Sequence, residues 1–250
     1  MITWRRVNYR GRVVDLRGGL WLGLWLVVAA ALGRGTTRQR ASAAAAIGLA
    51  GLVGLIDDHF GDSQTKGLRG HLTALVKGHF TTGGLKIVGL AGAGWLVAVG
   101  QPAPTKNSAT KTAVAGPAAK RGLDALLVAI SANLINLFDL RPGRAMKAAS
   151  LPLLLAAAGP GRAMAGATAA GIALALPGDL SERTMLGDCG AAALGTAIAI
   201  AQVRSGTTKQ KTLLAGGALA LTLLSERVSF SRLINQVKAL GWLDQLGRTP

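Results

Sequence analysis

The sequence predicts an all-α fold, a polytopic membrane helix bundle that forms a single domain over residues 1–250. Hydrophobic residues make up 50% of the chain, and only 16% of the residues are charged. A soluble domain usually has about 25% charged residues. In addition, eight nearly uncharged stretches of about 14–17 residues follow one another along the chain, and each approaches the length that crosses a bilayer.

The eight stretches are rich in Ala, Gly, Leu and Val and show no polar face, which is typical of helices that are apolar all round. Small residues such as Gly48, Gly51 and Gly54 allow helices to approach closely in lipid. We therefore expect about eight transmembrane helices, at 18–33, 41–56, 87–100, 125–138, 148–161, 163–178, 189–203 and 212–225.

Alternation of eight spans places both termini on the same side of the membrane. The loops on that side hold 17 of the 28 Lys and Arg residues, and the positive-inside rule makes this side cytoplasmic. Ten of the 11 acids are also there, several at helix ends, which predicts a cytoplasmic active-site cleft. The cytoplasmic segments expected are 1–17, 57–86, 139–147, 179–188 and 226–250, the last containing an amphipathic helix over 231–247.

Other protein classes fit less well. A single cysteine, Cys189, excludes a disulfide framework and a cysteine-based zinc site. The net charge of +17 is spread over both membrane faces instead of one stripe, so no nucleic-acid partner is expected. A transporter would place carboxylates inside its spans, whereas these lie at one face.

The first candidate site is Asp57-Asp58, at the end of the second stretch. Adjacent carboxylates repel, so the pair either retains a proton or holds a cation, which suits general-base work or metal binding. A solvated helix end is the alternative interpretation.

The second candidate is the run from Asn133 through Asn136 to Asp139, whose side chains share one helix face. Buried Asn residues also join helices in membranes, which is the alternative. Arg141 and Arg144 follow in a tight turn that suits a phosphate, although cations flank many cytoplasmic helix ends.

The third candidate is Asp188 in Gly187-Asp188-Cys189-Gly190, which is suited either to a helix N-cap or to binding Mg²⁺. The fourth is the basic, glycine-punctuated loop that contains Lys66 and His71. Such a loop can bind phosphates or anionic lipid.

Together these motifs resemble the polyprenyl-phosphate N-acetylhexosamine-1-phosphate transferase superfamily, which includes phospho-N-acetylmuramoyl-pentapeptide transferase. The family has an Asp-Asp pair, a Thr-Lys-Gly-Leu stretch, an Asn-x-x-Asn-Leu-x-Asp motif and a Gly-Asp-x-Gly motif. All four occur here in the family's order, at 57–58, 65–68, 133–139 and 187–190. The resemblance covers nearly the whole chain.

The resemblance implies Mg²⁺-dependent transfer of a sugar-1-phosphate from a UDP-sugar to a polyprenyl phosphate, with release of UMP, in cell-wall or surface-glycan synthesis. It implies that Asp188 binds Mg²⁺ and that Asp57 or Asp58 deprotonates or positions the lipid phosphate. Asp139 and Asn136 would line the nucleotide side, and Lys66 would lie near a phosphate. The expected partners are polyprenyl phosphate, a nucleotide sugar, the membrane and a second copy of the chain, at a bacterial inner membrane.

Some family features are missing. The family commonly has ten spans, a Lys soon after the Asp pair, a further acid after the Asn-Leu-x-Asp motif and a histidine-rich loop near the C-terminus. Here Gly61 and Asp62 follow His59-Phe60, and the turn at 141–144 stands where the acid is expected. These departures favour an alternative, a catalytically degenerate relative that binds polyprenyl-linked precursors or a cell-wall partner.

Overall fold

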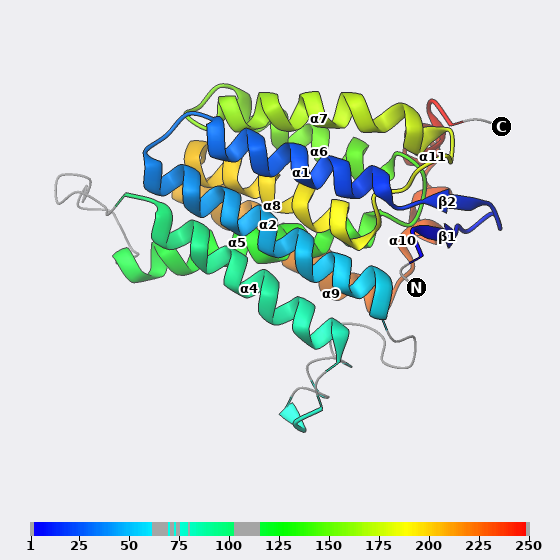
Figure 1. The fold of residues 1–250 in the computed structure, drawn as a ribbon, viewed down its shortest axis with the longest axis horizontal. Helices are drawn as coiled ribbons and strands as arrows, with labels where there is room; N and C mark the ends of the chain where they lie inside the picture. Colours follow the sequence, from blue (N-terminus) through cyan, green and yellow to red (C-terminus); the bar gives the residue numbers. More distant parts are fainter. Residues whose placement is uncertain are drawn as a thin grey trace.

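The computed structural model describes residues 3–61, 70, 73, 76–79, 81–102 and 116–248. These residues form ten helices and one two-stranded hairpin (Figure 1). The strands are β1 (Arg5–Val7) and β2 (Val13–Asp15). The helices are α1 (Arg17–Leu32), α2 (Thr37–Phe60), α4 (Thr82–Gly100), α5 (Pro117–Phe138), α6 (Arg144–Ala157), α7 (Arg162–Leu180), α8 (Gly187–Ser205), α9 (Thr208–Ser225), α10 (Phe230–Gln236) and α11 (Lys238–Gln245).

Each of the eight apolar stretches overlaps one of the helices from α1 to α9, although α6 begins and ends four residues earlier than the stretch at 148–161. Four of these helices, α2, α4, α5 and α7, are long and apolar enough to cross a membrane. A fifth span results if α9 and α10, which are bent by 101° relative to each other, count as one. The described helices therefore support four to five spans, and the larger number of eight stays a prediction.

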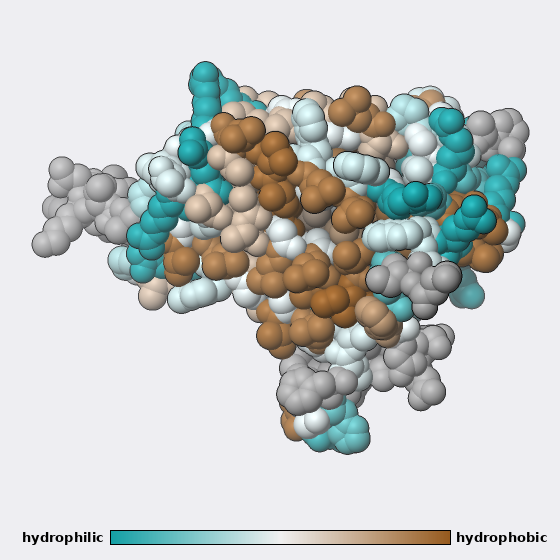
Figure 2. All heavy atoms as spheres, viewed as in Figure 1, coloured by the Kyte–Doolittle hydropathy of each residue, from teal (hydrophilic) through white to brown (hydrophobic). Residues whose placement is uncertain are grey.

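The surface also has the character of a membrane protein. Figure 2 shows hydrophobic side chains over the middle of the face formed by α1, α2 and α4, with hydrophilic side chains towards both ends. Exposed tryptophans on these helices include Trp21 and Trp95. Soluble proteins rarely expose large contiguous apolar patches, whereas lipid tails cover such a surface without cost.

Helix α8 forms the centre of the bundle and contacts α1, α2, α5, α6 and α7. Nearly all its residues between Gly187 and Val203 are buried, and most of them are Ala, Gly or Ile. Small side chains allow neighbouring backbones to approach closely. At Gly54 of α2, for example, a Cβ atom would collide with the backbone carbonyl of Asp188. This close approach brings the end of α2 against the start of α8.

The N-terminal hairpin is a departure from the all-α prediction. Strands β1 and β2 pair antiparallel, with Arg5 opposite Asp15, and Asp15 also forms a parallel bridge to Thr184 in the loop before α8. Each strand has only three residues, so any alternation of apolar and polar residues within segment 1–17 is too short to distinguish a strand from a loop by sequence. The bridge to Thr184 holds the hairpin against the end of the bundle that contains the acids.

Two other segments differ from their predicted extent. The expected amphipathic helix over 231–247 is divided into α10 and α11, because Val237 has an extended backbone. Each half is anchored separately, through a stack of Phe230 on Phe138 and an ion pair between Asp244 and Arg144. The predicted loop at 57–86 is shorter at both ends, since α2 continues to Phe60 and α4 begins at Thr82.

Candidate functional site

The carboxylate of Asp58 joins the last turn of α2 to the first turn of α8. Its Oδ1 accepts the backbone N–H of Asp188 and its Oδ2 accepts that of Cys189, both at 2.9 Å. Arg6 of the hairpin contacts the same carboxylate at 3.2 Å. The side chain of Asp58 is only 1% exposed, and these donors compensate for its burial. Asp58 thus acts as a cap for α8 supplied by another helix.

Lys86 of α4 connects the other two carboxylates of the predicted motifs. Its Nζ lies 3.2 Å from Oδ2 of Asp57 and 2.9 Å from Oδ1 of Asp188. The three side chains are largely buried, so one cation offsets two neighbouring anions. The sequence prediction missed Lys86, which stood at the edge of the expected loop. A lone cation next to an apolar stretch was the available signal, because such cations in membrane helices are usually functional.

Asp139 lies at the end of α5 and points its carboxylate into buried space. It is 5% exposed, and its Oδ2 has no hydrogen-bond partner among the described residues. Burial raises the pKa of Asp139 well above its usual value, and the charges of Asp179, Asp188 and Asp58 raise it further. A carboxyl group in this environment holds a proton more tightly than an exposed one.

A cavity of about 320 Å³ opens beside these acids. Its lining brings together residues from the hairpin, the end of α5, the end of α7 and the start of α8. The polar members include four acids, two arginines and two amides: Asp139, Asp179, Glu182, Asp188, Arg6, Arg141, Asn8 and Asn136. Motif residues that are far apart in sequence therefore face one cavity at one end of the bundle.

Arg141 is held at the cavity by the hairpin. Its guanidinium carbon lies 3.9 Å from the centre of the Tyr9 ring, a cation–π contact. The guanidinium remains part of the cavity wall. The planar group suits a phosphate, because it can donate two parallel hydrogen bonds.

Glu182 was not assigned a role by the sequence, although it belongs to the acids of the predicted cytoplasmic side. It is 5% exposed and has a φ of 54°, an uncommon value for a residue other than glycine. Its carboxylate accepts hydrogen bonds from Asn8 at 2.6 Å and from Arg10 at 3.0 Å. These bonds fasten the tip of the hairpin over the cavity.

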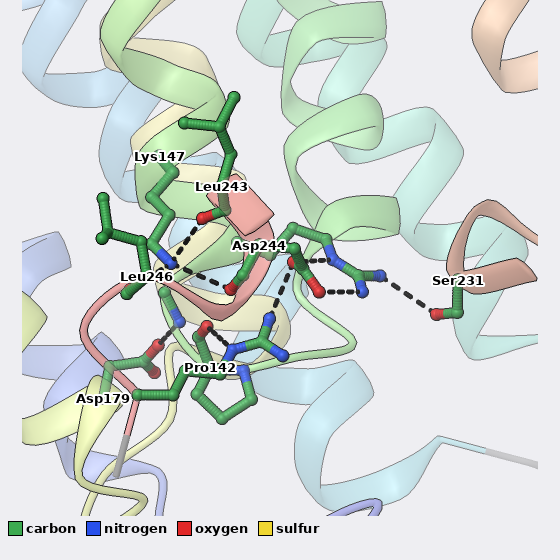
Figure 3. Close-up of polar contacts among 10 residues, drawn as sticks. Pro142, Lys147, Asp179, Ser231, Leu243, Asp244 and Leu246 are labelled. Atoms are coloured by element: carbon green, nitrogen blue, oxygen red, sulfur yellow. Dashed lines mark hydrogen bonds and ion pairs between the residues drawn. The ribbon is translucent and has the colours of Figure 1, made fainter. Parts of the chain in front are cut away.

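Arg144, in contrast, does not line this cavity. Its Nε and Nη2 donate to the two carboxylate oxygens of Asp244 at 2.7 and 2.9 Å, and its Nη1 donates to Ser231 at 3.0 Å. Figure 3 shows this cluster, in which Lys147 also reaches the backbone carbonyl groups of Leu243 and Leu246. The predicted phosphate-binding arginine is thus used to dock α11 on α6. Its charge is neutralised by a buried bidentate pair, which leaves it little capacity for a phosphate.

The remaining predicted residues fall into two groups. Asn133 faces another helix and donates to the hydroxyl of Thr222 in α9 at 3.4 Å, as expected of an amide that joins helices. Of the two asparagines of the predicted motif, Asn133 and Asn136, only Asn136 lines the cavity. Lys66 and His71 lie outside the described residues.

The donor chemistry of the site fits Mg²⁺. Within the described ranges, no group of three or more His, Cys, Asp or Glu residues is arranged to hold a metal by itself. Mg²⁺, however, is commonly held by one or two carboxylates together with substrate phosphates. Asp57 and Asp188 already share one cation. Asp139, whose Oδ2 has no partner among the described residues, lines the same cavity as Asp188.

No family model matches the chain, and neither the curated proteins nor the solved structures compared with it give a match. The resemblance to the transferase superfamily therefore rests on the four motifs and their order.

Proposed function

We propose that the chain is a Mg²⁺-dependent phosphoglycosyl transferase, which moves a sugar-1-phosphate from a UDP-sugar to a polyprenyl phosphate and releases UMP. One observation carries the proposal. The acids of three separate motifs, at 57–58, 139 and 188, gather at one end of the bundle beside a polar cavity. If the eleven acids were distributed at random over the 250 residues, there would be no reason for the acids of these three motifs to meet at one end of the bundle.

In the proposed reaction an oxygen of the lipid phosphate attacks the β-phosphorus of the UDP-sugar. A bond forms between that oxygen and the β-phosphorus, and the bond from the β-phosphorus to the bridging oxygen breaks. The electron pair of the broken bond leaves with UMP. The chemical demand on the protein is to bring two anionic phosphates together and spread their charge.

Each residue of the site then has a distinct contribution. Asp188 and Asp57 would hold Mg²⁺, which neutralises phosphate charge when bound. Asp58 fixes the start of α8 and thereby the position of Asp188. Arg6 and Arg141 line the cavity as cations for phosphate oxygens. Asp139, whose pKa is raised by burial, supplies a carboxyl group that holds a proton more tightly than an exposed one and can donate a hydrogen bond when protonated.

We further propose eight spans, a cleft on the cytoplasmic side and both termini in the cytoplasm of a bacterial cell. The bias of Lys and Arg towards the loops on that side supports this orientation. Membrane placement suits a reaction in which one substrate is a polyprenyl chain, because such a chain stays dissolved in lipid.

The test is release of UMP from a panel of UDP-sugars by the full chain in nanodiscs that contain undecaprenyl phosphate and Mg²⁺. We expect turnover with at least one donor, and a loss of at least about 100-fold in Asp188→Asn. Lys209→Gln, an exposed change in α9, serves as the matched control and should retain the wild-type rate. Absence of turnover with every donor, from a preparation that unfolds cooperatively, would contradict the proposal.

The alternative, a non-catalytic relative that binds a polyprenyl-linked precursor, is favoured by one specific contact. Lys86 already pairs with both carboxylates proposed for Mg²⁺. Saturable binding of undecaprenyl phosphate without UMP release from any donor would identify this alternative.

A further inference from the structure

A second polar cavity, of about 480 Å³, lies at the opposite end of the bundle from the acids. Gln39, near the start of α2, lines it, whereas Asp57 of the acidic site is near the end of the same helix. At a rise of about 1.5 Å per residue, these positions are about 27 Å apart. The second cavity is therefore a separate site.

The lining of the second cavity is strongly basic. It contains five cations and one acid, namely Arg34, Lys120, Arg121, Arg204, Lys211 and Asp124. Asp124 pairs with Lys211 at 2.8 Å, and the ion pairs found among the described residues include none of the other four cations. The cavity thus holds excess positive charge.

Arg204 shapes the floor of this cavity. It donates to the backbone carbonyl groups of Arg34 and Gln39, at 3.3 and 3.1 Å, and so fixes the turn between α1 and α2. Its Nε is buried and has no partner among the described residues. A buried donor without a partner costs free energy, and Arg204 therefore keeps hydrogen-bonding capacity that its two carbonyl acceptors do not use.

Helix geometry adds to the attraction for an anion. Pro117 and Thr208, the first residues of α5 and α9, both line the cavity. Helix α5 has no acid in its first turn and no side-chain cap. The partial positive charge of two helix N-termini therefore adds to that of the arginines and lysines.

We propose that this basic cavity binds a phosphate group, carried by an anionic lipid of the membrane leaflet opposite the acidic site or present as free phosphate. The rules of membrane topology make such charge unusual, because cations are normally enriched on the cytoplasmic side. The five cations and one acid that line this cavity favour a bound anion. The proposal is independent of the transferase activity at the acidic end.

The test compares Lys120→Gln/Arg121→Gln with wild type and with Lys209→Gln, a cation of the same end that does not line the cavity. The full chain in non-ionic detergent is titrated with dioctanoyl phosphatidic acid and, separately, with inorganic phosphate, by calorimetry. We expect the double variant to bind the phosphate ligand about tenfold more weakly, while the control binds as wild type does. A change confined to phosphatidic acid identifies lipid as the ligand, and an equal change in both identifies free phosphate.

Equal affinities of all three proteins for both ligands would overturn the proposal. Arg34→Gln provides a second variant if the double variant does not fold, because Arg34 is exposed in the turn between α1 and α2. It should weaken the same binding, and unchanged affinity in a folded Arg34→Gln would count equally against the site. Phosphate bound at the acidic end contributes the same background to every variant, since none of these changes touches that cavity.

Discussion

The carboxylate of Asp58 accepts the backbone N–H of Asp188, at 2.9 Å, across 130 residues of sequence. The same carboxylate also accepts the backbone N–H of Cys189, and the two hydrogen bonds connect the last turn of α2 to the first turn of α8. It means that the two aspartates of the proposed site do not act independently. Asp58 positions the backbone that carries the side chain of Asp188.

Asp58→Asn should therefore lower both stability and activity. An amide can accept only one of the two N–H groups, so a buried donor is left unpaired and unfolding becomes easier by about 1–3 kcal/mol. Thermal unfolding followed by circular dichroism measures the loss. Asp15→Asn, which removes a more exposed carboxylate paired with Arg17, is the control and should cost about 1 kcal/mol or less. Equal losses in the two variants would contradict the role of Asp58 as a cap.

Lys86→Gln should make the protein depend on a divalent cation. Removal of the ammonium group leaves Asp57 and Asp188 unpaired beside each other, a change that costs several kcal/mol when a buried pair is broken. Mg²⁺ at millimolar concentration should recover much of the lost stability in the variant and have a smaller effect in wild type. The measurement is the melting temperature with MgCl₂ or with EDTA. The same Mg²⁺ effect in both proteins would argue against a cation site at these carboxylates.

Asp139→Asn should stabilise the chain at neutral pH. The pKa of Asp139 is higher in the folded chain than in the unfolded chain, mainly through burial. Between these two pKa values the folded state holds a proton that the unfolded state lacks, so stability falls as pH rises from about 4 upwards. Each unit of pKa difference contributes about 1.4 kcal/mol.

An amide at position 139 has no proton to lose, so this part of the pH dependence should vanish in the variant. Melting temperatures of wild type and variant between pH 5 and 8 test the expectation. Parallel curves would show that Asp139 does not titrate in this way.

Arg144→Met should release the C-terminal helices without changing the acid-lined cavity, which Arg144 does not line. The change leaves Asp244 with Arg248 as its remaining cation, and loss of a buried partner costs about 3–5 kcal/mol. Limited proteolysis near Val237 should then become faster. The triple variant Arg144→Met/Asp244→Leu/Arg248→Met should regain most of the protection, because it also removes the buried cation that would otherwise lose its partner Asp244. Proteolysis as fast in the triple variant as in the single one would show that these ion pairs are not what holds α11.

The positions of the helices follow from the sequence in large part, because apolar stretches bounded by charges identify helices that lie in lipid. The starts of two helices were missed, since the predicted stretches begin at 41 and 125 whereas α2 begins at Thr37 and α5 at Pro117. The capping box of Thr36 and Gln39 and the proline at position 117 are the local signals that mark these starts. The hairpin and the break at Val237 are beyond such rules, because both depend on partners elsewhere in the fold, Thr184 for the first and Arg144 for the second.

The sequence alone determined that the chain is apolar and helical, and it assigned ten of the 11 acids to one set of loops, since composition and charge order along the chain carry that information. Only the tertiary structure decided which polar groups meet. Lys86 joins Asp57 to Asp188 because α4 packs on α2 and α2 packs on α8. Arg144, equally suited to a phosphate by sequence, turns instead to Asp244, a hundred residues away. A buried charge takes the partner that packing brings within reach, and spacing along the chain does not predict that partner.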